Sequence, residues 1–208
     1  MAKGILGRKL GMTQVFDPET GVVTPVTVIQ AGPCPVVEVK TTDTHGYDAV
    51  QLAYDPVAER KITKPEMGHL KKNGVEGAFR HLVELRGQSE LVVGENVTVE
   101  VFEPGEKIKV SGIAHGKGFA GTIKRHRFHR GPTSHGSHNV RKPGSIGASA
   151  TPSRVFKGQK MAGRLGGKRV TQSGLVVHEV RPDENLLLVK GAVPGPKNGF
   201  VEVREANN

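Results

Sequence analysis

Short apolar runs, rich in Val and Thr and bounded by Gly, Pro or Asp, dominate two parts of this chain. They are VVTPVTVIQ (22–30), PVVEVKTT (35–42), AVQLAY (49–54), NVTVEVF (96–102), LVVHEV (175–180), LLLVKGAV (186–193) and FVEVRE (200–205). Runs of this length that end in turn formers predict β-strands. In GAFRHLVELR (77–86), Phe79, Leu82, Val83 and Arg86 recur at helical spacing, which predicts a short amphipathic helix.

Many short strands with few helices indicate a mainly β protein, and a small β-barrel is the architecture we expect. The 28 Gly and 13 Pro among 208 residues argue against a helical bundle. The chain has no internal repeat of fixed period, which disfavours a propeller or a solenoid. We expect one or two short helices beside the barrel.

Residues 116–169 break the strand pattern. They hold thirteen apolar residues in 54, without a period of 2 or 3.6. Ordering each backbone residue costs roughly 1–2 kcal/mol, which so few scattered apolar side chains cannot offset. We therefore expect residues 1–115 and 170–208 to form the barrel domain. Residues 116–169 should form a long irregular loop that leaves this domain and is ordered by a partner.

Charge identifies the kind of partner. The net charge is +10, but residues 107–178 hold fifteen Lys or Arg and no Asp or Glu, whereas the other 136 residues carry a net charge of −5. Self-repulsion disfavours compaction of such a region unless a polyanion supplies the counter-charge. Its glycines and prolines prevent the long basic helix of a typical DNA reader. An extended, glycine-rich basic segment suits the crevices of folded RNA.

Two glycine-rich motifs resemble nucleotide-binding loops but lack features that such loops require. GKGFAG (116–121) matches the dinucleotide fingerprint, but the next acid, Glu179, lies far beyond the expected distance. GRLGGKR (163–169) lacks the spacing of a phosphate loop and has Arg169 where a magnesium-binding Ser or Thr is required.

The histidines form two H-x-x-H pairs, His126 with His129 and His135 with His138. Structural zinc sites nearly always include thiolates, and this chain has only Cys34, so we expect the imidazoles to contact bases or phosphates instead. Cys34 itself should be a small, half-buried residue beside a turn.

No acid lies near enough in the basic region to orient a catalytic His, so we expect no enzyme. No apolar run has the length of a signal peptide or a membrane span, and we expect a cytoplasmic protein.

Five segments resemble the bacterial ribosomal protein L3 family. They are KGILGRKLGMTQVF, VTVIQAGPCPVV, HGKGFAGTIKRH, RKPGSIGASATPSRVFKGQKMAGRLG and NLLLVKGAVPGPKNGFVEVRE, in family order from residue 3 to residue 205. The resemblance implies a barrel of the kind shared by translation proteins. It also implies a structural role in the large (50S) ribosomal subunit, direct binding to its 23S-type rRNA, and action early in subunit assembly.

The resemblance further implies that the extension reaches toward the peptidyl transferase centre and that ribosomal proteins L14 and L19 are neighbours. No cofactor is implied beyond magnesium associated with the rRNA. The predicted rRNA-binding residues are Lys117, Lys124, Arg125, Arg127, Arg130, Arg141, Lys142, Arg154, Lys157, Lys160, Arg164, Lys168 and Arg169. The predicted tip comprises Gly144, Ser145, Ile146, Gly147, Ala148, Ser149, Ala150 and Thr151.

This sequence departs from the family pattern at three places. Ala150 stands where many bacterial members have a Gln that is methylated in some of them, and Ala cannot accept that modification. Ser153 replaces the usual Gly, so we expect the local turn to lose a positive φ. Ser173 and Gly174 replace a common Gln-Asn pair.

Two other functions remain open on the sequence: a free RNA chaperone or regulator, and an RNA-modifying enzyme with a basic arm.

Overall fold

The computed structural model describes residues 3–17, 21–87 and 90–206. The chain divides into two compact units, one formed by the residues up to 114 and from 169 on, the other by residues 115–168. We name the first the barrel unit. The second is named the inserted unit because it interrupts the sequence of the first. No helix in the described ranges is both long and apolar enough to cross a membrane.

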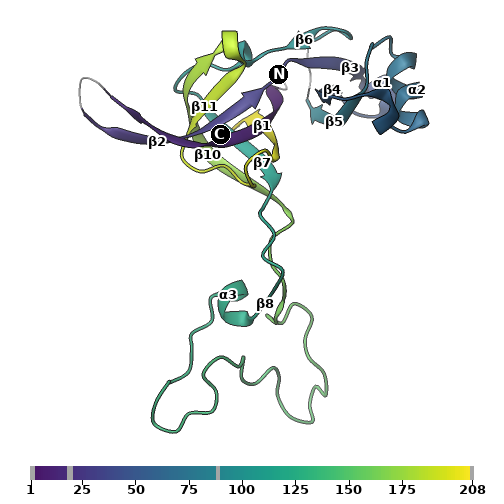
Figure 1. Cartoon of the computed structure of the whole chain (residues 1–208). Helices are drawn as coiled ribbons and strands as arrows, with labels where there is room; N and C mark the ends of the chain where they lie inside the picture. The colour runs from purple at the N-terminus through teal and green to yellow at the C-terminus, as the bar shows by residue number, and fades with distance from the viewer. Residues whose placement is uncertain (1–2, 18–20, 88–89, 207–208) are drawn as a thin grey trace. The chain divides into compact units, whose positions relative to one another are not determined.

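Six antiparallel strands close into a barrel in the order β1-β12-β7-β10-β11-β2 (Figure 1). They are β1 (Gly4–Phe16), β2 (Val23–Ala31), β7 (Lys107–Ile113), β10 (Arg169–Arg181), β11 (Leu186–Lys190) and β12 (Phe200–Glu205). Closure gives every strand two neighbours and so leaves no unpaired sheet edge. The prediction of a mainly β protein built on a small barrel is confirmed.

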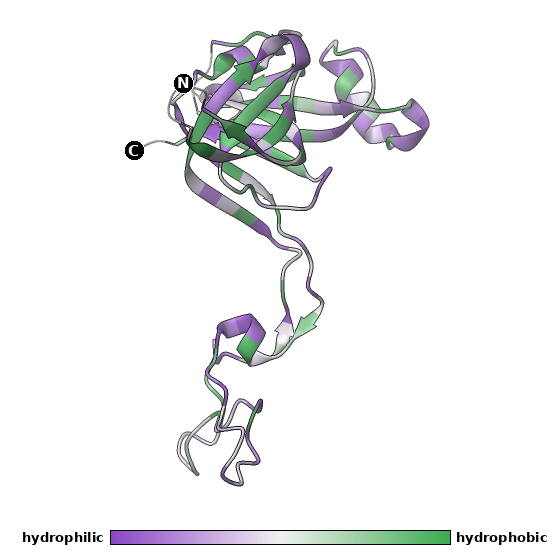
Figure 2. Cartoon of the chain, turned by 60° about the vertical axis from the view of Figure 1, so that its left-hand side comes forward, coloured by the Kyte–Doolittle hydropathy of each residue, from purple (hydrophilic) through white to green (hydrophobic). Residues whose placement is uncertain are grey.

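Alternate positions of these strands fill the barrel core. Ile5 of β1 pairs with Val203 of β12, which pairs in turn with Val110 of β7. These three side chains are fully buried, as are Leu187 and Val189 of β11. Figure 2 shows the resulting mixture of apolar and polar positions along the barrel strands. Burying each such side chain contributes roughly 1.5–3 kcal/mol, so the repeated alternation is what stabilises the barrel.

A second sheet of four strands, in the order β5-β4-β3-β6, completes the barrel unit. Its strands are β3 (Cys34–Lys40), β4 (Ala49–Pro56), β5 (Phe79–Arg86) and β6 (Asn96–Val97). Successive residues of β3 and β4 face different cores. Val36 and Leu52 join the barrel core, whereas Val37 and Ala53 pack with Leu70 of helix α2 (Lys64–Lys72). The two central strands are therefore buried on both faces.

Short helical elements connect these strands. The barrel unit also contains α1 (Thr42–His45) and the 3-10 helices η1 (Glu59–Lys61), η2 (Val99–Val101) and η3 (Pro182–Glu184). The inserted unit contains one strand pair, β8 (Phe119–Ala120) with β9 (Gly163–Arg164), and helix α3 (Thr122–His126). The described residues thus form three α-helices, where one or two were expected.

The predicted helix over residues 77–86 is wrong, because Phe79–Arg86 form strand β5. β5 pairs antiparallel with β4, with Leu85 opposite Val50. Phe79, Leu82 and Val83 do fit a helical period, but Leu85, which that pattern omits, is the deeply buried residue of the segment. Pairing with the buried strand β4 outweighs the local pattern, as is common for strands.

Other expectations are corrected in detail. The predicted strand over residues 96–102 is extended only at Asn96–Val97 before η2 begins. The 13-residue strand β1 and the shorter strand β7 were not predicted. Cys34 is fully buried instead of half-buried, and its thiol donates to the carbonyl oxygen of Leu6 at 3.4 Å. Burial raises the pKa of Cys34 to about 12, so the thiol stays protonated at neutral pH.

Substitution of two glycines of β1 tests how closely β1 packs on β2. A Cβ at Gly7 would lie 2.6 Å from the carbonyl oxygen of Gln30 and 2.9 Å from Cγ2 of Ile29, whereas one at Gly11 would have no neighbour within 4 Å. We expect Gly7→Ala to lower the free energy of unfolding by about 1–3 kcal/mol. Gly11→Ala should change it by less than about 0.5 kcal/mol. Urea denaturation followed by circular dichroism measures both, and equal effects would contradict the packing.

Candidate RNA-binding surface

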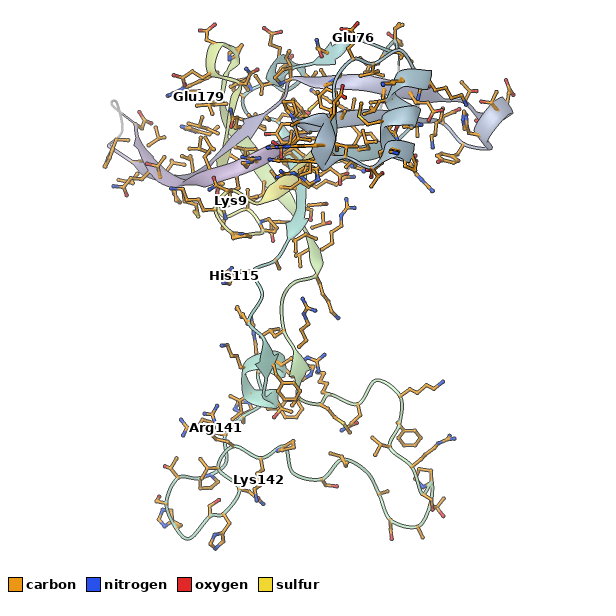
Figure 3. All side chains as sticks on the ribbon, turned by 45° about the vertical axis from the view of Figure 1, so that its right-hand side comes forward. Lys9, Glu76, His115, Arg141, Lys142 and Glu179 are labelled. Atoms are coloured by element: carbon orange, nitrogen blue, oxygen red, sulfur yellow. The ribbon has the colours of Figure 1, made fainter. Side chains whose placement is uncertain are left out.

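The inserted unit is basic and open to solvent. It holds twelve Lys or Arg, five His and no Asp or Glu. Of the thirteen predicted rRNA-binding residues, eleven are exposed and form no ion pair within the described parts of the chain. These eleven free cations are Lys117, Lys124, Arg127, Arg130, Arg141, Lys142, Arg154, Lys157, Lys160, Arg164 and Lys168. Arg141 and Lys142 are adjacent on one of its loops (Figure 3).

Arg125 differs from these eleven because it holds two distant segments of the inserted unit together. One of its terminal nitrogens donates to the carbonyl oxygen of Met161 at 2.7 Å, and Nε2 of His126 lies 2.9 Å from the same oxygen. A Cβ at Gly163 would lie 2.6 Å from the Arg125 guanidinium, so the glycine leaves room for it. The structure thus gives Arg125 a positioning role within the unit.

A short strand pair organises the two ends of the inserted unit. Phe119 of β8 pairs with Arg164 of β9, and the amide of Lys117 donates to the carbonyl oxygen of Leu165 at 2.9 Å. The amide of Leu165 in turn donates to the carbonyl oxygen of Gly118 at 2.9 Å. These bonds place Lys117 and Arg164 on facing segments, which concentrates positive charge there.

Residues 131–140 form a closed loop within the inserted unit. The amide of Gly131 donates to the carbonyl oxygen of Val140 at 3.0 Å. The loop carries His135 and His138, both exposed. His126 lies beside Met161 instead, and the described residues contain no group of three or more His, Cys, Asp or Glu side chains placed to hold a metal ion. The histidines therefore remain candidates for RNA contacts.

The predicted tip, residues 144–151, is exposed throughout. The hydroxyl of Ser145 donates to the carbonyl oxygen of Gly147 at 2.9 Å, and the hydroxyl of Ser153 donates to that of Ala150. Ser153 has a φ of 55°, so the expectation that this turn loses its positive φ is wrong. The hydrogen bond from its own side chain to the backbone stabilises this turn.

Arg169 lies in the barrel unit, on β10, and not in the inserted unit. It donates to the carboxylate of Glu202, which is 3% exposed and also pairs with Arg204. Two arginines thus neutralise one buried carboxylate, which would be costly to bury unpaired. Binding of RNA by Arg169 stays a prediction, and its guanidinium already has a partner.

Exposed aromatic side chains were missed in the sequence analysis. Phe119 is 81% exposed and Phe156 is 60% exposed, and the Arg154 guanidinium lies 5.8 Å from the centre of the Phe156 ring. Exposed rings beside cations are typical platforms for stacking of unpaired bases. The signal was present in the sequence, because the acid-free region holds only three aromatic residues, and they lie among many cations and glycines with few apolar residues to pack against.

The bond from Arg125 to Met161 yields a prediction about the free protein. Arg125→Ala should speed amide hydrogen exchange at residues 161–164 about two- to tenfold, as expected for loss of a hydrogen bond that contributes about 0.5–1.5 kcal/mol. Lys124→Ala is the matched control, because Lys124 is an exposed cation of the same helix. Exchange measured by mass spectrometry should leave the control unchanged. If both variants exchange at the rate of the parent chain, the hydrogen bond from Arg125 to Met161 is absent in solution.

Comparison with known proteins agrees with this geometry. The model of the family described as ribosomal protein L3 matches residues 87–185. A large ribosomal subunit protein uL3 from Synechococcus sp. (strain JA-3-3Ab) is 55% identical over 208 residues, covering 99% of this chain and 97% of the relative.

Two other proteins with the same name are equally similar. The one from Acidothermus cellulolyticus is 56% identical and covers 98% of this chain and 92% of its own length. The one from Streptomyces coelicolor is 54% identical and covers 98% of this chain and 96% of its own length. Identity at this level over nearly the whole of each chain establishes common ancestry and a common fold. The chain therefore belongs to the ribosomal protein L3 family.

Proposed function

We propose that this chain is a structural constituent of the large ribosomal subunit and binds large-subunit rRNA directly through the inserted unit. The observation that carries the proposal is a compact unit of 54 residues with twelve Lys or Arg and no acid. Its relatives are named as large ribosomal subunit proteins. The chain has a structural and not a catalytic role, and it acts in the ribosome, in the cytoplasm.

The free cations explain why the partner should be a nucleic acid. A protein that neutralises phosphates releases condensed counterions, which favours binding by each Lys or Arg involved. Positive φ at Gly118, Gly136, Gly144 and Gly158 lets the backbone turn sharply between cations. Such a chain follows an irregular phosphate surface more readily than the regular groove of a duplex.

The finer assignments rest on the family resemblance and on the composition of the tip. Residues 143–153 form a neutral stretch of small side chains between Lys142 and Arg154. Small, uncharged residues suit close approach of the backbone to crowded RNA, with the flanking cations holding the stretch in place. We place this tip near the peptidyl transferase centre and propose L14 and L19 as neighbours. We further propose a contribution to early assembly.

Salt dependence tests the phosphate contacts. If about eight of the eleven free cations meet phosphates, the logarithm of the affinity for deproteinised large-subunit rRNA should fall with log salt at a slope of about −6 to −7. Arg127→Gln with Arg130→Gln should make the slope shallower by about one to two, because two phosphate contacts are lost. Filter binding at several salt concentrations measures both values.

The matched control is Lys190→Gln with Lys197→Gln, which removes the same charge from exposed positions of the barrel unit. It should retain the parent slope. A slope near zero for the parent chain would overturn binding through phosphates, and equal slopes for the two double variants would remove Arg127 and Arg130 from the interface.

The tip yields a separate prediction. Gly147 lacks a positive φ, and a Cβ there would have only the carbonyl oxygen of Arg154 as a neighbour, at 3.8 Å, so Gly147→Asp should not disturb the free protein. In assembled subunits, Gly147→Asp or Ser149→Asp should alter peptidyl transfer or the protection of nearby nucleotides by drugs bound at that centre. The affinity for rRNA should fall only modestly.

Ser134→Asp is the control for the tip, because Ser134 is an exposed residue of the loop 131–140 in the same unit and receives the same charge. It should leave both assays unchanged. Parent-like behaviour of Gly147→Asp and Ser149→Asp in both assays would show that the tip lies away from the centre.

A further inference from the structure

A second concentration of positive charge lies in the barrel unit, on η1 and α2. Five exposed cations occur within thirteen residues, which we name the α2 patch: Arg60, Lys61, Lys64, Lys71 and Lys72. The acids of the same segment are Glu59 and Glu66. The cluster is inconspicuous in the sequence because the acid-free region dominates the charge of the chain.

The α2 patch stands out against the charge of its surroundings. Outside residues 107–178 and outside the segment 59–72, the chain holds ten Lys or Arg against eighteen Asp or Glu. A surface whose cations serve only solubility mixes both signs. Here the positive charge collects on one short segment, while the rest of the barrel unit is acidic.

The cations of the α2 patch also lack the ion pairs that other basic residues of the barrel unit form. Lys3 pairs with Glu106 at 2.7 Å, and Lys40 pairs with Glu84 at 2.5 Å. In the described part of the chain, none of the five patch cations lies within ion-pair distance of a carboxylate. Their charge is therefore available to a partner.

Glu66 is engaged at the start of the helix. Its carboxylate accepts hydrogen bonds from the hydroxyl of Thr63 at 2.7 Å and from the Thr63 amide at 3.1 Å. These two bonds hold the pKa of Glu66 below its usual value. A carboxylate fixed in a capping box stabilises the helix end and does not reach the cations of the last turn.

Helix α2, which carries Lys64, Lys71 and Lys72 of the patch, is firmly held. Leu70 is fully buried and packs with Val37, Ala53 and Val75. On the same helix, Nε2 of His69 lies 2.7 Å from Oε1 of Gln51 in β4. Because the backbone is already ordered, a ligand of the patch need not supply the free energy for ordering it.

The surface between η1 and α2 is hollowed. An open depression of about 610 Å³ is lined by the cations Arg60, Lys64 and Lys71 together with Ile62, Met67 and Gly68. Glu59 also borders it. A Cβ at Gly68 would have no neighbour within 4 Å, so the helix surface there is open. Three cations around an open depression fit the phosphates and sugars of a nucleic-acid backbone.

We propose that the α2 patch is a second rRNA-binding surface, which contacts phosphates independently of the inserted unit. The proposal rests on the proposed binding of large-subunit rRNA and adds a site to it. An acidic protein segment is the competing partner. Protein interfaces, however, depend on apolar or aromatic anchors, and no large hydrophobic residue of the segment 59–72 is exposed. A surface with charge but no anchor favours the phosphate backbone.

Directed cleavage of the rRNA tests the location. Cys34 is fully buried, and its pKa is raised to about 12, so in Gly68→Cys the new thiol alone should react with an iron chelate that generates hydroxyl radicals. Gly68→Cys retains all five cations of the patch. Bound to deproteinised rRNA, the labelled chain should cleave the backbone at a defined set of nucleotides. Glu184→Cys, an exposed position on η3, is the control tether and should not cleave those nucleotides.

Charge removal tests the energetics with the same RNA. Lys64→Gln with Lys71→Gln should reduce the magnitude of the salt slope by about 1.5, as expected for two lost phosphate contacts. Lys190→Gln with Lys197→Gln should retain the parent slope. Specific cleavage from residue 68 together with the shallower slope would support the proposal.

The negative outcomes are distinguishable. If the parent chain shows no salt-dependent binding, the proposed function itself fails. If Arg127→Gln with Arg130→Gln weakens binding while the Lys64 and Lys71 variant matches its control, the inserted unit binds rRNA and the α2 patch does not. Parent-like RNA binding combined with poor incorporation of the patch variant into subunits would assign the surface to a protein neighbour and overturn the proposal.

Discussion

The antiparallel pairing of β7 with β10 is the contact on which the rest of the structure depends. It joins strands 56 residues apart in sequence, from Ile113 opposite Arg169 to Lys107 opposite Val176, and it closes the barrel between β12 and β11. The hydroxyls of Ser111 and Thr171, 2.8 Å apart, reinforce it. Because Ile113 and Arg169 are directly paired, the chain leaves the barrel and returns to it at neighbouring positions. Loop-closure entropy rises only slowly with length, so the barrel tolerates a long insertion there.

That arrangement lets the chain separate two incompatible tasks. The barrel unit buries its apolar residues and pairs several of its charges, including the buried Glu202 with Arg169 and Arg204. The inserted unit has few apolar residues and unpaired positive charge, which would destabilise a compact core. Its few internal ties, such as the bond from Arg125 to Met161, set the course of the backbone without neutralising its charge. The free cations are thereby left for phosphates.

The sequence was informative where one physical effect dominates. Alternation of Val with polar residues identifies β12, and the absence of acids from residues 107–178 identifies the basic unit. Prediction failed where contacts with residues distant in sequence decide the local structure or the role of a side chain. Residues 79–86 fit both helical and extended patterns, and only pairing with β4 selects the strand. The role of Arg125 depends on Met161, 36 residues further on, which no local pattern reveals. The start of α2, by contrast, carried a readable signal in the capping box of Thr63 and Glu66.

We propose that the barrel unit folds by itself while the inserted unit supplies the main affinity for rRNA. The most direct test replaces residues 115–168 with a short Gly/Ser turn between Ala114 and Arg169 and compares the two chains. We expect the shortened chain to unfold cooperatively in urea and to lose at least about a hundredfold in affinity for large-subunit rRNA at moderate salt, as loss of most phosphate contacts requires. In cell lysate, the full chain should sediment stoichiometrically with the large subunit and the shortened chain should not. Parent-like affinity and sedimentation of the shortened chain, or loss of its cooperative unfolding, would contradict the account.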